Sequence, residues 1–300
     1  MKYDVYAYGM ISSSMLHVLQ GKYPEADCYA EIKESFRMVG GEAANSSIVL
    51  RKLGVGVKLD GNWLGENPDG HFTKEILDSY GIDTSRLTLK KDYTGVSEIV
   101  FADGLTRTNF GTYVRLLFTE KQWNIPSRED IESARIVCLD PFFKDESAHV
   151  ARICREVNKP YVSIDAHPED DISRYADVMI ISGEFRHREY KGTNKEELFD
   201  RYIAQSRGLV ILTSGGDEIL YGRAGQGMKK ASAYKITPID TAGGGDSFRS
   251  GILYGMLQGW SDEQTITFAS ALAACVCLSF PGVLNSPEFG EVDRFMREHG

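Results

Sequence analysis

The chain has 300 residues, of which 42% are hydrophobic and 26% are charged, and its formal net charge is −9. These fractions are typical of a globular protein that can bury a large core without disulfides or metals. The negative charge argues against nucleic acid or an anionic membrane as the main partner. A small molecule bearing phosphate remains compatible with it, because a nest of backbone N–H groups can bind an anion on an acidic protein.

The N-terminal segment MKYDVYAYGM lacks the long apolar core of a secretory signal and predicts a first β-strand. No apolar run approaches the roughly 18–20 residues that span a bilayer. The cysteines are odd in number and have no zinc-binding spacing, which indicates reduced core thiols and predicts a cytoplasmic protein. They are Cys28, Cys138, Cys154, Cys275 and Cys277.

The first third of the chain predicts strands that are half exposed to solvent. Residues 28–38 and 93–102 are rich in β-forming residues with partial alternation, and a helical pattern over 42–53 lies between them. Two such ribbons predict a small sheet that forms a lid, from about 10–38 and 93–112, over a main sheet. Edge strands of the main sheet fit the same pattern equally well.

Short apolar runs alternate with amphipathic segments in the rest of the chain. We predict one α/β domain over residues 1–300, with a doubly wound, mostly parallel sheet flanked by helices, because such alternation is typical of that fold class. Ligands bind these sheets at the carboxyl ends of the strands. The predicted strands cover 136–140, 161–165, 177–182 and 209–213, and the predicted helices cover 146–158, 196–205, 247–258 and 262–280.

A glycine-rich turn, IDTAGGGDSF at residues 239–248, is the most informative segment. Three consecutive glycines cost roughly 0.5–1 kcal/mol each relative to alanine in regular structure, which indicates a geometric need. A helical pattern follows, so the glycines lie at a helix N-terminus, where free N–H groups and the dipole favour an anion. Asp246 falls in the first turn, where it either caps the helix or lies beside a bound anion.

A second glycine pair, Gly40 and Gly41, precedes the helical pattern that ends before Gly54. The pair lets the chain approach a ligand closely. Asn45 offers a donor and acceptors suited to sugar hydroxyls. Taken alone, an Asn45 that caps the helix or is solvated is the simpler interpretation.

Together the two segments resemble the ribokinase-like (PfkB) carbohydrate kinases. The first is similar to the family motif D-T-x-G-A-G-D, with Gly244 in place of alanine, and the second to G-G-x-x-x-N-x-[SA]. The resemblance implies an ATP-dependent kinase whose turn, including Gly243, Gly244 and Gly245, forms an anion hole for the transferring phosphoryl group. It implies that Asp246 takes the proton from a substrate hydroxyl. It also implies that Gly41 lines the substrate pocket and Asn45 contacts substrate hydroxyls.

Weaker similarities imply a nucleotide site. The nucleotide-side residues of the glycine turn are Thr241 and Ala242, and the neighbouring Asp240 matches an aspartate that helps to bind a monovalent cation such as K⁺ in relatives. A role for Asp240 in stabilising the turn is equally plausible. Two further segments resemble a T-x-G turn after a strand and a loop that closes over adenine; they contribute Thr213, Gly215, Pro281 and Gly282.

The chain departs from the better-known sugar kinases where a substrate-binding aspartate follows the first strand. Ser12 and Ser14 stand in that segment as candidate substrate contacts. A serine can still form a hydrogen bond, but it cannot make the charge-assisted pair of contacts that a carboxylate makes with a diol. Arg107 is a candidate contact to an anionic or polyhydroxylated substrate, although a solvated turn residue explains it as well. Phe101 and Phe110 are candidates to cover an apolar sugar face or to pack under the lid.

The family's N-x-x-E motif, associated with Mg²⁺ and phosphate, is replaced by SGEF at residues 182–185. Glu184 is a candidate to act on Mg²⁺ through water, because magnesium usually retains several waters. Asp165, at the end of a predicted strand, is a second candidate near the phosphates, and an ordinary turn residue is its alternative role.

The preferred function is the transfer of the ATP γ-phosphoryl group to a sugar or a sugar derivative. The alternatives are a nucleoside kinase and a catalytically weak sensor of the same fold, motivated by the altered serine and magnesium segments. The expected partner is a small-molecule substrate, and a homodimer through the lid is common in this family. The chain contains neither a G-x-G-x-x-G after an early strand nor a P-loop motif, which argues against dinucleotide-binding oxidoreductases and P-loop enzymes.

Overall fold

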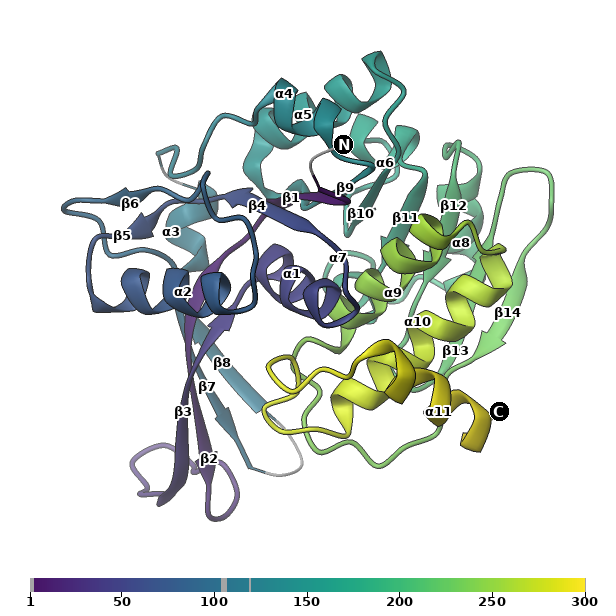
Figure 1. Ribbon diagram of the computed structural model, residues 1–300. Coiled ribbons are helices and arrows are strands. Elements are labelled where there is room, and N and C mark those ends of the chain that lie inside the picture. The colour runs from purple at the N-terminus through teal and green to yellow at the C-terminus, as the bar shows by residue number, and fades with distance from the viewer. Residues whose placement is uncertain (1–2, 104–106, 119, 300) are drawn as a thin grey trace.

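The computed structural model describes residues 3–103, 107–118 and 120–299. Positions 104–106 of the expected lid and the first two residues of the expected first strand lie outside the described residues. Eight strands form the main sheet in the order β14-β13-β12-β11-β10-β9-β1-β4 (Figure 1). All pairs from β4 to β12 are parallel, and β13 and β14 are antiparallel. The strands are β1 (Val5–Gly9), β4 (Val57–Gly61), β9 (Ile136–Leu139), β10 (Tyr161–Ile164), β11 (Val178–Ile181), β12 (Leu209–Leu212), β13 (Glu218–Gly222) and β14 (Lys229–Ser232).

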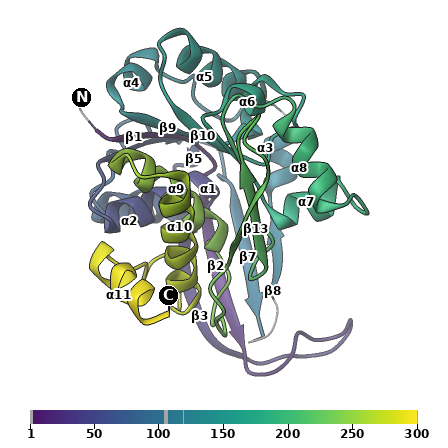
Figure 2. The ribbon, with the colours of Figure 1, turned by 90° about the vertical axis from the view of Figure 1, so that its right-hand side faces the viewer.

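Helices cover both faces of the main sheet (Figure 2). The alternation of side chains along a strand explains why: Val5 and Ala7 of β1 belong to one buried apolar cluster, and Tyr6 and Tyr8 belong to the other. The first cluster includes α1 (Glu42–Lys52), α2 (Pro68–Ser79), α9 (Gly244–Gln258), α10 (Asp262–Cys277) and α11 (Phe289–His299), and the second includes α4 (Arg128–Ser133), α5 (Lys144–Glu156), α6 (Asp171–Tyr175), α7 (Gly183–Glu189) and α8 (Lys195–Ile203). The predicted doubly wound sheet is therefore confirmed.

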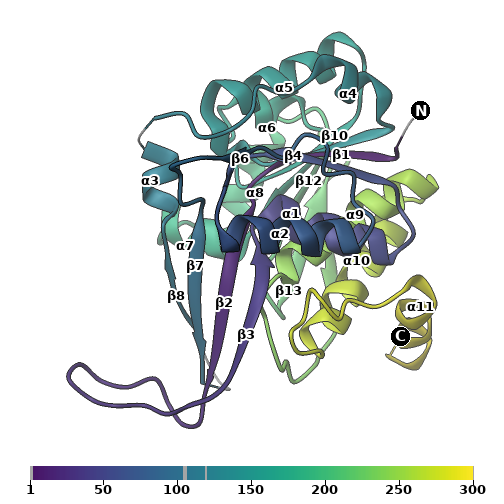
Figure 3. The same ribbon diagram turned by 60° about the vertical axis from the view of Figure 1, so that its left-hand side comes forward.

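A separate four-stranded sheet, here called the small sheet, extends away from the main body (Figure 3). Its order is β3-β2-β7-β8, so the two predicted ribbons do not pair with each other, because β2 lies between them. The edge-strand alternative is wrong. The strands are β2 (Ser12–Leu19), β3 (Ile32–Gly40), β7 (Ser97–Ala102) and β8 (Arg107–Gly111); the remaining short elements are β5 (Leu64–Gly65), β6 (Leu89–Lys90), α3 (Tyr113–Phe118) and a 3₁₀ turn (Pro141–Phe143).

The strand register assigns two faces to the small sheet. The inner face carries Leu16, Met38 and Val100, which pack against Phe280 and Leu284 of the main body. The outer face carries Met15, His17, Ile99, Phe101 and Phe110, because these residues alternate with the inner ones in the paired strands.

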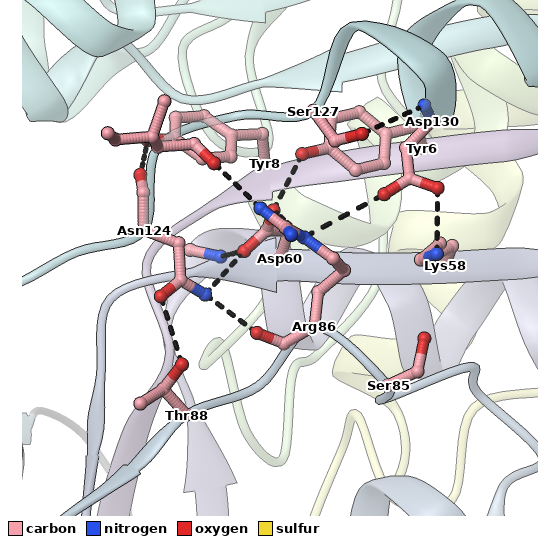
Figure 4. Close-up of polar contacts among 12 residues, drawn as sticks. Tyr6, Tyr8, Lys58, Asp60, Ser85, Arg86, Thr88, Asn124, Ser127 and Asp130 are labelled. Atoms are coloured by element: carbon pink, nitrogen blue, oxygen red, sulfur yellow. Dashed lines mark hydrogen bonds and ion pairs between the residues drawn. The ribbon is translucent and has the colours of Figure 1, made fainter.

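A polar network around Asp60 joins the carboxyl end of β4 to the neighbouring loops that carry Arg86 and Asn124 (Figure 4). The fully buried carboxylate of Asp60 accepts hydrogen bonds from the Tyr6 hydroxyl at 2.8 Å, Arg86 Nε at 3.0 Å and Asn124 Nδ2 at 2.8 Å. A buried charge with this many donors is compensated, so the network ties β1, β4 and two loops together.

The five cysteines are free thiols, but the prediction that all of them are core residues is wrong, because Cys28 is exposed and Cys275 and Cys277 are only partly buried. Within the described part of the chain, none of the helices combines the length and the apolar character that crossing a membrane requires.

Candidate active site

The N-termini of α1 and α9 meet at one edge of the main sheet. Asn45 Nδ2 donates a hydrogen bond of 2.8 Å to Asp246 Oδ2, which joins the two glycine segments that the sequence singled out. The residue before α9 is Gly243, so Asp246 does not cap its helix and its carboxylate instead points toward α1. Gly41 precedes α1 with φ of +94°, and a Cβ there would lie 2.4 Å from the carbonyl oxygen of Met10. The close approach of the segment after β1 therefore requires glycine.

The pKa of Asp246 is raised from its ordinary value of 3.8 to about 6. Burial is the main cause, because desolvation penalises the charged carboxylate. The positive charges of Arg249 and Arg107 and the hydrogen bond from Asn45 act in the opposite direction, and the charge of Asp140 raises the pKa further. A partly buried carboxyl group with a pKa near 6 is ionised at neutral pH and able to accept a proton.

A fully buried ion pair lies behind this carboxylate. Arg249 Nη1 donates to Asp140 Oδ1, and Nε and Nη2 donate to Ser46 Oγ at 3.1 and 3.0 Å. Met10 N–H donates to the second oxygen of Asp140 at 2.8 Å. The pair links the ends of β1 and β9 to α1 and α9, and it was not predicted from the sequence. The sequence feature that points to it is a lone arginine within a helix of mostly apolar and small residues.

The glycine turn presents backbone donors beside Asp246. The N–H groups of Ala242 and Gly244 are already engaged, with Asp240 Oδ1 at 2.9 Å and the Thr241 carbonyl at 3.3 Å. Gly245 and Asp246 lie in the first turn of α9, where N–H groups have no acceptor within the helix. Among the described residues no atom lies within 4 Å of a Cβ built on Gly245, so the turn faces open space. It can bind an anion there.

The inner face of the small sheet lies opposite the helix ends. Ser12 is fully buried and Ser14 is 5% exposed, and both are on this face with Arg107 of β8. The positive charge of Arg107 lowers the pKa of Asp246, in agreement with the place of Arg107 on the inner face. The suggestion that Phe101 and Phe110 cover a sugar or pack under the lid is wrong, because alternation along β7 and β8 places both on the outer face.

A pocket of about 640 Å³ opens beside the glycine turn. Three residues predicted to contact the nucleotide, Thr213, Gly215 and Thr241, line it together with Gly244 and Gly245 of the glycine turn. Its apolar wall was not predicted, because it depends on how the segment after β14 packs against α10. That wall includes Tyr234, Ile236, Phe248, Ala273 and Ala274, and the rim carries the basic residues Arg186, His187 and Lys235.

The predicted adenine loop supports the glycine turn. Gly282 N–H donates to Asp240 Oδ2 at 3.3 Å, and the bond preceding Pro281 is cis. Because Ala242 N–H occupies the other oxygen of Asp240, this carboxylate joins the two loops, in agreement with the turn-stabilising alternative. Ala242, Pro281 and Gly282, three other predicted nucleotide contacts, are not part of the pocket lining among the described residues.

Two carboxylates lie near the far side of the pocket. Glu184 is an exposed residue of its lining, whereas Asp165 accepts hydrogen bonds from the N–H of Ser182 at 2.7 Å and from its hydroxyl at 2.8 Å. Burial raises the pKa of Asp165 to about 6. No cluster of three His, Cys, Asp or Glu side chains that could hold a metal ion occurs in residues 3–103, 107–118 and 120–299. A magnesium ion that comes with phosphates needs only one or two carboxylates, which this pair fits.

A doubly wound sheet with a glycine turn, a poised carboxylate and an adjoining pocket defines a small-molecule phosphotransferase. A family model described as pfkB family carbohydrate kinase matches residues 17–288, and the chain belongs to this family. A nucleoside kinase of Methanothermobacter thermautotrophicus is 26% identical, with 93% of this chain and 91% of that protein covered. A 5-dehydro-2-deoxygluconokinase of Bacillus licheniformis is 24% identical, with 87% of both covered.

A solved structure of Arabidopsis thaliana ribokinase complexed with ribose and ATP has the same fold. Its TM-score is 0.81 at 16% identity, and 99% of each chain is covered. The chain therefore has the ribokinase fold and belongs to a family of carbohydrate kinases.

Proposed function

We propose that the protein transfers the γ-phosphoryl group of ATP to a hydroxyl of a sugar or sugar derivative bound between the small sheet and the helix ends. The observation that carries the proposal is the 2.8 Å hydrogen bond between Asn45 and Asp246. It supports Asp246 as the general base, because the bond holds this carboxylate between α1 and the first turn of α9, which the glycine turn begins. Phosphoryl transfer depends mainly on positioning and on electrostatic stabilisation, which this arrangement provides.

In the proposed mechanism Asp246 takes the proton from the attacking hydroxyl. The oxygen then attacks the γ-phosphorus as the bond to the leaving ADP oxygen breaks, and the N–H groups of Gly245 and Asp246 stabilise the charge on the phosphoryl oxygens. Gly243 and Gly244 allow the turn to adopt this shape. Asn45 holds the Asp246 carboxylate in place and contacts hydroxyls of the acceptor.

The nucleotide occupies the 640 Å³ pocket in this proposal, with Thr213, Gly215 and Thr241 along the phosphates. Glu184 and Asp165 would hold Mg²⁺ through water, and the ion would neutralise phosphate charge. Asp240 with its neighbouring loop would hold a monovalent cation such as K⁺. Replacement of K⁺ by Na⁺ or Li⁺, with activity as the readout, tests this last point.

The small sheet acts as a lid of a single 1–300 domain in this proposal. Closure would exclude water and limit wasteful hydrolysis of ATP. Its outer face exposes 43% of Ile99 and 51% of Phe110, and we infer that a second copy covers this face in a twofold dimer. Light scattering of wild type and of Phe110→Glu tests the dimer. Free thiols support the cytoplasm as the compartment.

The first experiment is ADP release from MgATP with sugars, sugar acids and nucleosides as acceptors. Asp246→Asn is the test variant, and Asp293→Asn on the exposed side of α11 is the control. We expect turnover with one acceptor class and a loss of about 10²–10⁴-fold in kcat for Asp246→Asn, at unchanged ATP binding. Full activity of this variant would exclude the proposed base.

A nucleoside is the second candidate acceptor, favoured by the relative named nucleoside kinase. Turnover of nucleosides with no turnover of free sugars would select it. ATP binding by calorimetry without turnover of any acceptor would instead support a ligand sensor.

A further inference from the structure

Ser14 stands where sugar-kinase relatives have an aspartate, but another carboxylate lies beside it. Ser14 of β2 is in register with Glu98 of the adjacent parallel strand β7. Residues in register on neighbouring strands project from the same face of a sheet. Glu98 is therefore on the inner face, beside Ser14, and it was not recognised from the sequence.

One carboxylate oxygen of Glu98 is held by a hydrogen bond, and the other is available to a ligand. Tyr113 donates its hydroxyl proton to Glu98 Oε2 at 2.7 Å. A Cβ built on Gly40 would lie 2.4 Å from Glu98 Oε1, so the absence of a side chain at Gly40 makes room for this oxygen. No hydrogen bond to Oε1 is formed by another described residue.

An unpartnered hydroxyl lies at the same place. Ser12 Oγ is buried and would be 2.7 Å from the same Cβ on Gly40; it lies near the Tyr113 hydroxyl but forms no hydrogen bond of normal geometry with a described residue. Buried polar groups are nearly always paired, so a lone one beside a half-free carboxylate points to a ligand that supplies the missing bonds. The combination is more specific than an acidic side chain alone.

We propose that Glu98 is the diol-binding carboxylate of the acceptor site, relocated from β2 to β7. It accepts hydrogen bonds from two neighbouring hydroxyls of the acceptor, with Ser12 Oγ beside it, while Asp246 receives the proton of the attacking hydroxyl. Tyr113 is a positioning residue that fixes the carboxylate. The inference rests on the proposed function and narrows its acceptor to a molecule with a vicinal diol.

The charge of Glu98 favours a hydroxyl donor over an anion at this point of the acceptor site. Arg249 is fully occupied by Asp140 and Ser46 and lies behind the site, whereas Arg107 of the inner face is a basic residue that can meet an anionic group elsewhere on the acceptor. A carboxylate of the acceptor placed beside Glu98 would be repelled by it. The diol, by contrast, makes charge-assisted hydrogen bonds, which are about twice as strong as neutral ones.

The test compares acceptors that differ by one hydroxyl of the diol: D-ribose with 2-deoxy-D-ribose, and inosine with 2′-deoxyinosine. We expect wild type to prefer the diol member of the pair that it phosphorylates by at least about tenfold in kcat/KM. Glu98→Gln should reduce this preference to about two- to threefold, mainly through KM. Glu34→Gln is the control, because Glu34 is an exposed carboxylate near the far end of the same sheet.

A rescue variant separates a substrate contact from a structural role. Ser14→Asp combined with Glu98→Ala returns a carboxylate to β2, and we expect it to restore most of the preference for the diol. Tyr113→Phe should weaken the preference less than Glu98→Gln does. Circular dichroism and calorimetric ATP binding verify that each variant is folded.

The outcomes distinguish this inference from the proposed function. An unchanged preference in Glu98→Gln would overturn the role of Glu98 and leave the kinase intact. A wild type without turnover of any acceptor would overturn the proposed function and this inference with it.

Discussion

Arg249 and Asp140 form an ion pair in which both side chains are completely shielded from solvent. Arg249 comes from the second turn of α9, and Asp140 directly follows β9. Two further hydrogen bonds from the guanidinium to Ser46 and one from Met10 N–H to Asp140 complete the pairing. The ion pair therefore fixes α9, the helix that carries Asp246, to the carboxyl end of the sheet. Separating the two buried charges would carry a large free-energy cost.

Replacement of Arg249 by methionine should destabilise the fold strongly. It leaves the Asp140 carboxylate buried and unpaired, which costs about 3–5 kcal/mol of unfolding free energy. Urea unfolding followed by circular dichroism measures the loss. Arg297→Met is the control, because Arg297 pairs with Asp293 on the exposed surface of α11 and should change stability by about 1 kcal/mol or less. Equal losses in the two variants would contradict the structural role of the pair.

The sequence predicted those parts of the fold that depend on local patterns. Strands such as β11 and β12 are buried on both faces, so they appear as continuous apolar runs that need no knowledge of the rest of the molecule. Asn45 and Asp246 were also singled out individually, because each follows glycines at the start of a predicted helix, but their hydrogen bond was not predicted. β2 was not recognised as a strand, since its first three residues are serines.

The missed residues depend on contacts between distant segments. Arg249 is a residue type that is normally exposed, and only Asp140 and Ser46 make its burial possible. The face of Glu98 is set by its register with β2, and the face of Phe110 by its register with β7. A one-residue shift in either register would exchange the two faces, so local sequence could not decide them.

The network around Asp60 provides a second stability test, away from the phosphates (Figure 4). Asp60→Ala leaves the donors of Tyr6, Arg86 and Asn124 without their buried acceptor, and we expect a loss of about 3–5 kcal/mol. The kcat of the folded protein should stay within about twofold, because none of these groups lies in the proposed mechanism. Asp69→Ala, which removes a surface pair with Arg37, is the control and should cost about 1 kcal/mol or less. A normal stability of Asp60→Ala would refute the role of the network.

Gly41 and Gly54 offer a matched pair of alanine substitutions. Both have positive φ, +94° and +80°, so each substitution carries the left-handed penalty of roughly 1–2 kcal/mol. Gly41→Ala also places Cβ 2.4 Å from the Met10 carbonyl oxygen, whereas Gly54→Ala meets no described atom within 4 Å. Gly41→Ala should therefore lose more stability and at least about tenfold in kcat/KM, since α1 and Asn45 must shift. Equal activities of the two variants would show that the close approach is not needed.

The pH dependence of activity should have an acid limb set by Asp246. The pKa of this carboxyl is about 6, raised mainly by burial, so kcat/KM should fall about tenfold per pH unit below that value. Asn45→Ala removes a hydrogen bond that lowers the pKa, and its acid limb should move to higher pH. The control is Asn285→Ala, which removes a hydrogen bond to the Phe280 carbonyl in an exposed loop. An acid limb unchanged by Asn45→Ala would contradict the coupling.

The same pKa has a consequence for stability with a definite sign. Because the folded protein holds the Asp246 proton more tightly than the unfolded chain does, this group's stabilising contribution is complete below about pH 3.8 and is lost as the pH rises through about 6. Asp246→Asn removes this dependence. Urea unfolding at pH 4.5, 5.5 and 7 should therefore show wild type becoming progressively less stable relative to Asp246→Asn. If wild type instead gained stability relative to the variant over this range, the carboxylate would be stabilised by its surroundings and its pKa would be lowered, which would remove the basis for a base poised near pH 6.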